Sequence, residues 1–284
     1  MLLQIKDIEK QYKKFKLHCS MEVKEGHITG LIGQNGAGKS TTFKAILDLI
    51  RLDSGEIFLF GKNHTKLTNK EREDIGVVLS NATFPDRMTP HEIGHVMENL
   101  YSKFHLDHFY RQCEKKEIPL DKRIKEFSTG MKAKLKVLIA LSYQAKFLIL
   151  DEPTEGLDVI ARKEILDLLR EYMEEEEDRV ILISSHISSD LEGLCDDLYM
   201  IHQGKIILHE ETDTILSQYG LIKVDEKQYE KLEKKYLIKR KKEMFGYSCL
   251  TDQRQFYLEN YPEIIVEKGT IDEVIEMMIK GENK

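Results

Sequence analysis

Long apolar runs are missing from this sequence. No stretch of about eighteen apolar residues occurs, which is the length that a membrane-spanning helix needs, so we expect that the chain does not cross a bilayer itself. Residues 1–7 carry no signal-peptide pattern. Internal repeats and low-complexity linkers are also missing, which argues against a repeat architecture.

Cysteine is scarce, and its spacing excludes the common cysteine motifs. The four cysteines are scattered without a Cys-x-x-Cys pair, and the ten histidines show no metal-ligand spacing. We therefore expect reduced thiols in a cytosolic protein. The cysteines are Cys19, Cys113, Cys195 and Cys249.

A positive charge excess is missing as well. The net charge is −7 at pH 7, so nothing overall suggests a nucleic-acid partner. The 284 residues suit one large domain or a domain with an appendage, and 41% hydrophobic residues are enough for a sizeable core.

The most informative stretch that is present is the loop Gly-Gln-Asn-Gly-Ala-Gly-Lys-Ser at residues 33–40, which fits the phosphate-binding pattern G-x-x-x-x-G-K-[ST]. Apolar spacing predicts a buried strand over residues 28–32 and a helix over residues 41–52. Glycines let backbone N–H groups surround a phosphate, Lys39 can reach the β- and γ-phosphates, and the Ser40 hydroxyl can ligate Mg²⁺. The alternative, a glycine-rich turn with an unrelated lysine, is disfavoured by the flanking strand and helix.

The apolar pattern over residues 1–26 predicts antiparallel strands, with Tyr12 and Phe15 between them. An aromatic residue at this place either packs in the core or stacks on adenine ahead of the phosphate loop. We expect the stacking role for Tyr12.

The middle of the chain predicts an inserted helical region. A strand over residues 75–79 precedes Ser80, and helices are expected within residues 89–127, opened by a capping box at Thr89. Asp107 is expected to cap the second of these helices. The insertion separates two strands as a subdomain would.

The next buried strand, over residues 147–153, ends in two acids. Asp151 matches the Walker B position, where a carboxylate holds Mg²⁺, and Glu152 is suited to polarise a water molecule against the γ-phosphate. The alternative, surface acids at a strand-to-loop turn, is disfavoured by the phosphate loop upstream. Ser128 is a natural N-cap for the helix that leads into this strand.

A further buried strand, residues 180–183, leads to His186. A lone histidine usually has a structural role, but His186 ends a strand at the edge where parallel sheets bind ligands. A hairpin is expected over residues 198–208.

Residues 216–284 predict a small α/β appendage. Asp225 is expected to cap a helix that carries Tyr229, Leu232 and Tyr236 on one face. Farther on, Thr270 opens a terminal helix with a capping box. The role of this region is not readable from the sequence.

Basic residues cluster within this appendage, at residues 234–235 and 239–242. We interpret them as a solvated strand or helix face. Contact with anionic lipid head groups is the alternative.

Residues 1–215 resemble the nucleotide-binding subunit of an ATP-binding cassette (ABC) transporter. The resemblance implies an α/β fold of the P-loop NTPase type, with a mixed core sheet, an antiparallel β subdomain, a helical subdomain at about residues 85–140 and the small C-terminal α/β appendage. The motifs occur in family order: Tyr12 at the aromatic loop, Walker A at residues 33–41, the signature at residues 128–131, Walker B at residues 148–152, the D-loop at residues 156–158, and the switch histidine His186.

The resemblance implies an ATPase that binds ATP and Mg²⁺ and forms a head-to-tail homodimer or heterodimer of nucleotide-binding subunits. Each ATP is then held by Walker A of one chain and by the signature helix of the other, whose N-terminus suits a phosphate. The implied catalytic residues are Glu152 and His186; the implied nucleotide-binding residues are Tyr12, Gly33, Gln34, Asn35, Gly36, Ala37, Gly38, Lys39, Ser40, Thr41, Ser128 and Gly130; the implied metal ligands are Ser40, Asp151 and Ser80.

The sequence departs from the family pattern in three motifs. In the signature, Phe127, Thr129 and Met131 replace the usual Leu, Gly and Gln, and the Ser-Thr-Gly-Met form resembles bacterial exporters of the ABC-2 class. Ser80 stands where the family glutamine contacts Mg²⁺ and the membrane subunit. Glu155 replaces a small polar residue before the D-loop glycine.

The function that the resemblance implies is that of the ATP-binding and ATP-hydrolysing subunit of an exporter. It would power a separate transmembrane permease subunit from the cytoplasmic, inner face of the cell membrane. The rival is a soluble cassette protein that acts on the ribosome or on nucleic acid, which two cassettes or a long coiled-coil insertion would favour; this sequence shows neither. The transported substrate is not readable, because substrate contacts in this family belong to the membrane subunit.

Overall fold

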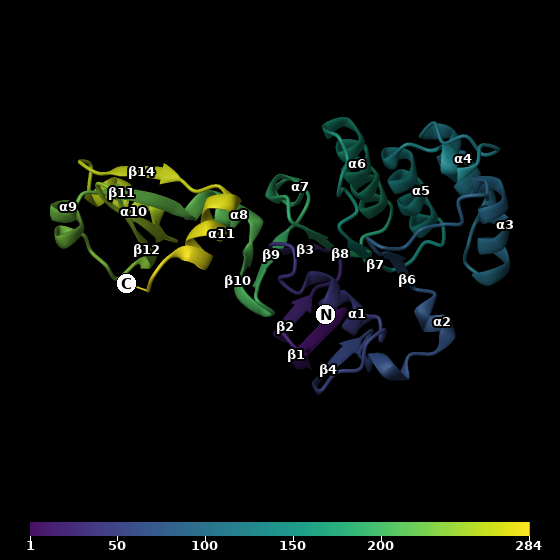
Figure 1. The fold of residues 1–284 in the computed structure, drawn as a ribbon, viewed down its shortest axis with the longest axis horizontal. Helices are drawn as coiled ribbons and strands as arrows, with labels where there is room; N and C mark the ends of the chain where they lie inside the picture. The colour runs from purple at the N-terminus through teal and green to yellow at the C-terminus, as the bar shows by residue number, and fades with distance from the viewer. Residues whose placement is uncertain (284) are drawn as a thin grey trace.

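The computed structural model describes residues 1–283 and is built around a six-stranded sheet (Figure 1). In spatial order its strands are β10 (Lys205–Glu211), β9 (Asp197–His202), β3 (Ile28–Ile32), β8 (Val180–Ser185), β7 (Phe147–Asp151) and β6 (Ile75–Val78). Neighbours from β9 to β6 are parallel, whereas β10 is antiparallel to β9. Every residue of β3, β7 and β8 is buried, as expected for parallel strands that are covered on both faces.

A second sheet, antiparallel as predicted, is formed mainly by the N-terminal strands. In spatial order it contains β2 (Lys16–Val23), β1 (Leu3–Gln11), β4 (Ser54–Leu59) and β5 (Lys62–Asn63). Helix α1 (Lys39–Ile46) packs between the two sheets, where Phe43 and Ile46 belong to an apolar cluster that includes strands of both (Figure 1). The loop before α1 is therefore anchored from two sides.

The prediction of a helix over residues 41–52 was wrong at both ends. The helix begins at Lys39 and ends at Ile46. Asp48 has a φ of 57°, a left-handed conformation that a helix cannot contain. Leu47 and Ile50 keep the apolar pattern because they pack against the N-terminal cluster rather than because they continue the helix.

The segment between β6 and β7 is mostly helical, and α5 (Thr129–Leu141) and α6 (Val159–Glu175) cover the face of the central sheet opposite α1 (Figure 1). The capping box at Thr89 is confirmed: the Glu92 N–H donates to Thr89 Oγ1 at 3.2 Å, and the Thr89 N–H donates to Glu92 Oε2 at 2.9 Å. Between β6 and β7 lie α3 (Pro90–Leu100), α4 (Leu106–Lys115), η2 (Ile124–Glu126) and α5. The short helices η1 (His64–Lys66) and α2 (Asn69–Arg72) precede β6, and α7 (Ser188–Glu192) follows β8.

The prediction that Asp107 caps the second of these helices was wrong. Helix α4 already begins at Leu106, so His105 occupies the N-cap position and Asp107 lies in the first turn. A carboxylate there still favours the helix, because it faces the positive end of the helix dipole. No helix within residues 1–283 is long and apolar enough to cross a membrane.

A third, antiparallel sheet of four strands lies in the C-terminal region, in the order β12-β13-β11-β14: β12 (Leu237–Glu243), β13 (Gly246–Thr251), β11 (Gly220–Val224) and β14 (Ile265–Lys268). With α9 (Glu226–Lys231) and α10 (Arg254–Asn260) between strands, the chain order is β-α-β-β-α-β, the ferredoxin-like arrangement. Helices α8 (Thr212–Gln218) and α11 (Ile271–Lys280) flank it in sequence.

The two caps predicted in this region are confirmed, but one helix is shorter than expected. Asp225 and Thr270 each form a capping box. Helix α9 ends at Lys231, so the prediction that Tyr236 shares its face was wrong. Tyr229 and Leu232 are buried, and the chain leaves the helix after them to enter β12.

The C-terminal sheet shares an apolar core with the central sheet. Neighbouring residues of β11 face opposite sides of this sheet. Ile222 packs with Tyr229 of α9 and Tyr257 of α10, whereas Leu221 belongs to the main apolar cluster, which also contains residues of the central sheet.

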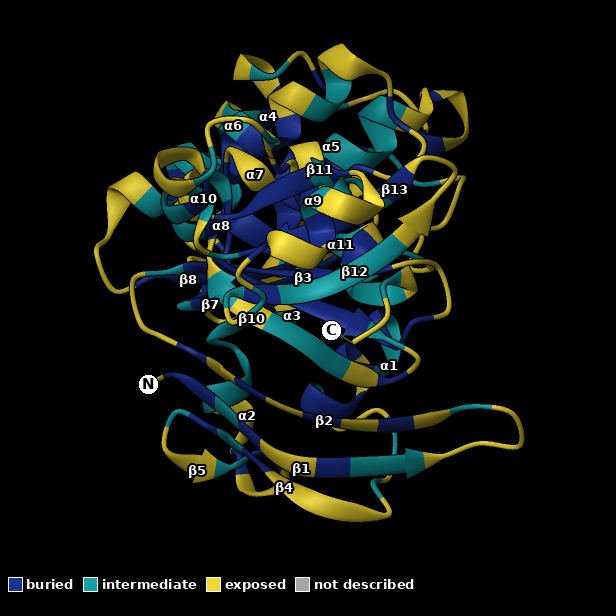
Figure 2. Cartoon of the chain, turned by 90° about the vertical axis from the view of Figure 1, so that its left-hand side faces the viewer, coloured by how far each residue is buried: buried dark blue, intermediate teal, exposed yellow. Residues whose placement is uncertain are grey.

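Helix α11 adds Val274 and Met277 to that main cluster, which also contains Leu191 of α7. The C-terminal region is therefore packed onto the segment that follows β8. Figure 2 looks onto the C-terminal region and shows an exposed outer surface on α11.

The basic cluster of β12 is largely paired within the chain. Lys241 lies 3.3 Å from Glu276 and Glu243, and Lys242 lies 3.4 Å from Glu226. Such exposed pairs are worth little energy, but they favour the interpretation of a solvated face.

All four cysteines are free and buried. Burial raises the pKa of Cys19 to about 11 and the pKa values of Cys113 and Cys249 to about 12. These thiols therefore stay protonated and unreactive at neutral pH.

Candidate functional site

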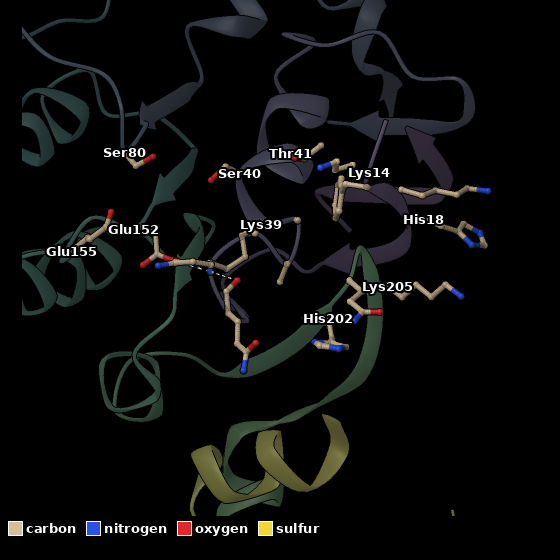
Figure 3. Close-up of a pocket in the computed structure, with 18 residues that line it drawn as sticks. Lys14, His18, Lys39, Ser40, Thr41, Ser80, Glu152, Glu155, His202 and Lys205 are labelled. Atoms are coloured by element: carbon tan, nitrogen blue, oxygen red, sulfur yellow. Dashed lines mark hydrogen bonds and ion pairs between the residues drawn. The ribbon is translucent and has the colours of Figure 1, made fainter. Parts of the chain in front are cut away.

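The candidate site lies at the edge of the central sheet where its parallel strands end. β3 leads into the glycine-rich loop, β7 ends at Asp151, and β8 leads to His186. Open α/β sheets bind ligands at this edge. A cavity of about 1020 Å³ opens there (Figure 3), lined by Lys14, Phe15, Lys16, His18, Gln34, Asn35, Gly36, Ala37, Gly38, Lys39, Ser40, Thr41, Ser80, Glu152, Glu155, His202, Gln203 and Lys205.

The glycine-rich loop needs glycine at two of its positions. Gly36 and Gly38 have φ values of 81° and 123°, in the left-handed region that other residues rarely adopt. A Cβ atom at Gly38 would also lie 3.1 Å from Phe15 and from Ile201. The loop leads directly into α1, and the first backbone N–H groups of a helix have no partner within it, so this end of the cavity suits an anion.

Lys39 is buried at the bottom of this loop, with 5% of its surface exposed. Its Nζ donates to the carbonyl oxygens of Gly33 at 2.5 Å and Gln34 at 3.3 Å, and lies 3.0 Å from Glu152 Oε1. In Figure 3 the two side chains approach each other from opposite walls of the cavity. A buried ammonium needs such a partner, because an unpaired charge there is strongly destabilising.

Glu152 joins the lysine to His186. Its second oxygen, Oε2, lies 2.7 Å from His186 Nδ1 and accepts the His186 backbone N–H at 3.2 Å. The Glu152 backbone has a φ of 51°, a conformation that costs energy in a non-glycine residue and that recurs at functional sites. A carboxylate oriented by a histidine has the arrangement of a general base with its positioning partner.

Asp151 is held beside this pair by two hydroxyl groups. Ser184 Oγ donates to Asp151 Oδ1 at 2.8 Å, and Ser80 Oγ donates to Oδ2 at 3.1 Å. Ser40 and Ser80 both line the cavity. Within residues 1–283 no group of three or more His, Cys, Asp and Glu side chains could hold a metal by itself. One carboxylate with hydroxyl groups nonetheless fits Mg²⁺, which is usually held by few side chains together with substrate phosphates.

The aromatic residue at the cavity is not the one that we expected to stack on a base. Phe15 lines the cavity, whereas Tyr12 is not among its lining residues and is 41% exposed. The two ring centroids lie 6.2 Å apart. Sequence reasoning noted both residues but had no signal for which of them the β1–β2 turn directs inward.

Sequence reasoning missed the residues that two turns bring to the cavity wall. Lys14, Lys16 and His18 come from the β1–β2 turn and the start of β2. His202 and Lys205 flank the β9–β10 turn, whose Gly204 N–H donates to Ala37 O at 2.8 Å. In Figure 3 the labelled members of this group lie on the side of Lys39 away from Glu152. No motif marks them, because the turns meet only in the folded chain.

Ser128 and Gly130 lie apart from this cavity. Ser128 caps α5 as predicted, accepting the Met131 N–H at 3.2 Å, and neither residue is among those that line the cavity.

A smaller cavity of about 230 Å³ adjoins Glu152, and Lys136 of α5 is one of its lining residues. Burial, followed by the charge of Lys132, lowers the pKa of Lys136.

Comparisons with known proteins show which family this chain resembles in sequence. A family model described as "ABC transporter" matches residues 17–155. The chain is 35% identical over 215 residues to the "Bacitracin transport ATP-binding protein BcrA" of Bacillus licheniformis, covering 72% of this chain and 68% of that protein. It is 33% identical over 224 residues to the "Lantibiotic transport ATP-binding protein SrtF" of Streptococcus pyogenes, covering 75% of this chain and 92% of that protein.

A solved structure described as "Structure of ATP binding subunit of ABC transporter" superposes with a TM-score of 0.66 at 27% identity. The superposition covers 77% of this chain and 93% of that one. The cassette fold expected from the sequence, with its mixed sheet, antiparallel sheet and helical insertion, is therefore confirmed.

Proposed function

This chain belongs to the ATP-binding proteins of the ABC transporter family, and from that membership we propose that it hydrolyses ATP at the sheet-edge cavity to power a separate transmembrane subunit. One observation carries the proposal. Glu152 contacts the buried Lys39 through one oxygen and His186 through the other. A base oriented beside a phosphate-binding lysine suits the in-line attack of water on a γ-phosphate.

Phosphate binding is assigned to the glycine-rich loop and the start of α1. Backbone N–H groups there would surround the phosphates, and Lys39 would exchange its contact with Glu152 for the β- and γ-phosphates. ATP binding would then free Glu152 to act on water. The proposed binding residues are Gly33, Gln34, Asn35, Gly36, Ala37, Gly38, Lys39, Ser40 and Thr41.

Replacing Lys39 with alanine tests this assignment. ATP affinity measured by calorimetry should fall at least about tenfold, which requires a loss of only ~1.4 kcal/mol from a charge-assisted contact. Lys44→Ala is the matched control, because Lys44 is an exposed lysine on the same helix and does not line the cavity. Equal ATP affinity in the two variants would remove Lys39 from the phosphate site.

Adenine is proposed to stack on Phe15 rather than on Tyr12, although Tyr12 occupies the family's aromatic position. Phe15→Ala should lower ATP affinity about tenfold, in the range of base–aromatic stacking, and Tyr12→Ala by less than about twofold. Inorganic tripolyphosphate, which has no base, should bind both variants like the parent protein. A larger loss of ATP affinity in Tyr12→Ala than in Phe15→Ala would assign the stacking role to Tyr12.

Magnesium is proposed to bind beside the phosphates. Ser40 and Asp151 would hold the ion, and Ser80, whose hydroxyl donates to Asp151, would contribute the third oxygen. The ion, when bound, would neutralise charge on the transferred phosphoryl group.

The signature residues Ser128 and Gly130 are proposed to complete the cavity of a second subunit in a head-to-tail dimer. Their separation from the cavity of their own chain supports this, as does the N-terminus of α5, where a helix presents backbone N–H groups that suit a phosphate. The second subunit is either a copy of this chain or a related cassette.

The membrane partner is proposed to be an exporter subunit, with this chain at the cytoplasmic face of the membrane. Two relatives are described as bacitracin and lantibiotic transport proteins, which supports a role in transport rather than action on the ribosome or on nucleic acid. The net charge of −7 also disfavours nucleic acid.

We further propose that the chain divides into a cassette at residues 1–215, with its helical subdomain at about residues 85–140, and an accessory region at residues 216–284. The separate C-terminal sheet supports this division.

A further inference from the structure

We propose that Asp190 is a positioning residue for ATP hydrolysis, which ties the loop after β7 to the segment after β8 so that Glu152 and His186 meet. Asp190 lies in α7, shortly after His186, and is 2% exposed. This inference rests on the proposed function, because the positioning affects turnover only if Glu152 and His186 act on ATP.

The first contact of Asp190 reaches the loop that carries Glu152. Thr154 Oγ1 donates to Asp190 Oδ2 at 2.7 Å, and Thr154 is itself only 1% exposed. Between Glu152 and Thr154 lies Pro153, whose ring fixes its own φ. Because the link is short and stiff, the place of the Thr154 side chain constrains the place of Glu152.

The second contact reaches the far end of the same loop. Arg162 Nη1 lies 3.5 Å from Asp190 Oδ1, and Arg162 Nη2 donates to Leu157 O at 3.4 Å. The Leu157 N–H in turn donates to Thr154 O at 3.2 Å. One carboxyl group in α7 therefore anchors both halves of the loop over residues 152–158.

Glu152 needs such anchoring, because its backbone is in an unfavourable conformation with a φ of 51°. A residue stays there only when its surroundings hold it. The Glu152 N–H is already bonded to Ser184 of β8, through the carbonyl oxygen at 3.2 Å and Oγ at 3.1 Å. Asp190 adds a second tie to the same side of the site, and its own N–H donates to Ile187 O at 3.3 Å, beside His186.

Two near-isosteric variants, Asp190→Asn and Thr154→Val, test the proposal on the full chain. Each should lower kcat for ATP about tenfold, because small misplacements of reacting groups cost up to about a hundredfold. KM and the Kd for ATP should change by less than about twofold, since neither residue lines the cavity. Thr154→Ser keeps the hydroxyl group and should retain normal turnover.

Two further variants separate positioning from mere stability. Glu192→Gln, which changes an exposed acid on α7, should behave like the parent protein. The double variant Asp190→Asn/Thr154→Val should lose no more activity than the worse single variant, because the two residues act through one contact. Normal kcat per folded molecule in both single variants, with only a lower melting temperature, would overturn the proposal.

Hydrogen exchange distinguishes failure of this inference from failure of the proposed function. If the parent protein binds ATP without hydrolysing it, the proposed catalysis is wrong. Whether Asp190 anchors the loop over residues 152–158 is then tested by hydrogen exchange at the amides of Glu155 and Leu157. Their N–H groups donate to Glu152 O and Thr154 O within that loop. Faster exchange at both amides in Asp190→Asn would support the anchoring of the loop by Asp190, and unchanged exchange would overturn it.

Discussion

Turnover of ATP is expected to fall about a thousandfold when Glu152 is replaced by glutamine, while ATP still binds. Glutamine keeps the shape of the side chain but lacks the basic oxygen that takes a proton from the attacking water. Because the phosphates are held by other groups, the variant should accumulate as an ATP-bound dimer. Phosphate release, calorimetry, and size-exclusion chromatography with light scattering measure these three properties.

The control for Glu152 is another glutamate with no part in the site. Glu174 lies exposed near the end of α6, so Glu174→Gln makes the same change of charge without touching the cavity. It should turn over ATP normally. Hydrolysis by Glu152→Gln at a rate near that of Glu174→Gln would exclude Glu152 as the general base.

His186→Ala is expected to lower turnover about a hundredfold with little loss of ATP affinity. The imidazole lies 2.7 Å from Glu152 Oε2, so it can orient the carboxylate and the attacking water. Its removal should cost little stability, because the side chain is 32% exposed and the His186 backbone N–H keeps its bond to Glu152.

Melting temperature and turnover must be measured on one preparation of His186→Ala. A histidine that only completes the end of a strand predicts the opposite result, a lower melting temperature with normal turnover per folded molecule. That outcome would remove His186 from the catalytic pair. His95→Ala, at an exposed histidine of α3, controls for the loss of an imidazole elsewhere.

Much of the fold could be predicted because its signals are local. The apolar run over residues 28–32 is a strand with those bounds, and the capping boxes at Thr89 and Thr270 open helices. The strand expected over residues 147–153 ends two residues earlier, at Asp151. Errors arose where tertiary packing overrode the local pattern. The apolar residues after Ile46 continue the spacing of α1, yet they pack against the N-terminal cluster without being helical.

The sequence by itself determined the chemistry available to this protein: a loop able to bind phosphate, two acids at a strand end and a histidine at another. Those assignments depend on residue types at short spacing, which a linear pattern contains. Only the tertiary structure decided which groups meet. It brought Lys39 to Glu152, Ser80 to Asp151 and Thr154 to Asp190. The tertiary structure also places Phe15, and not Tyr12, in the wall of the cavity. The physical reason is that these contacts join residues far apart in the chain, or depend on the twist of a turn, so their geometry follows from the packing of sheets and helices and not from any local pattern.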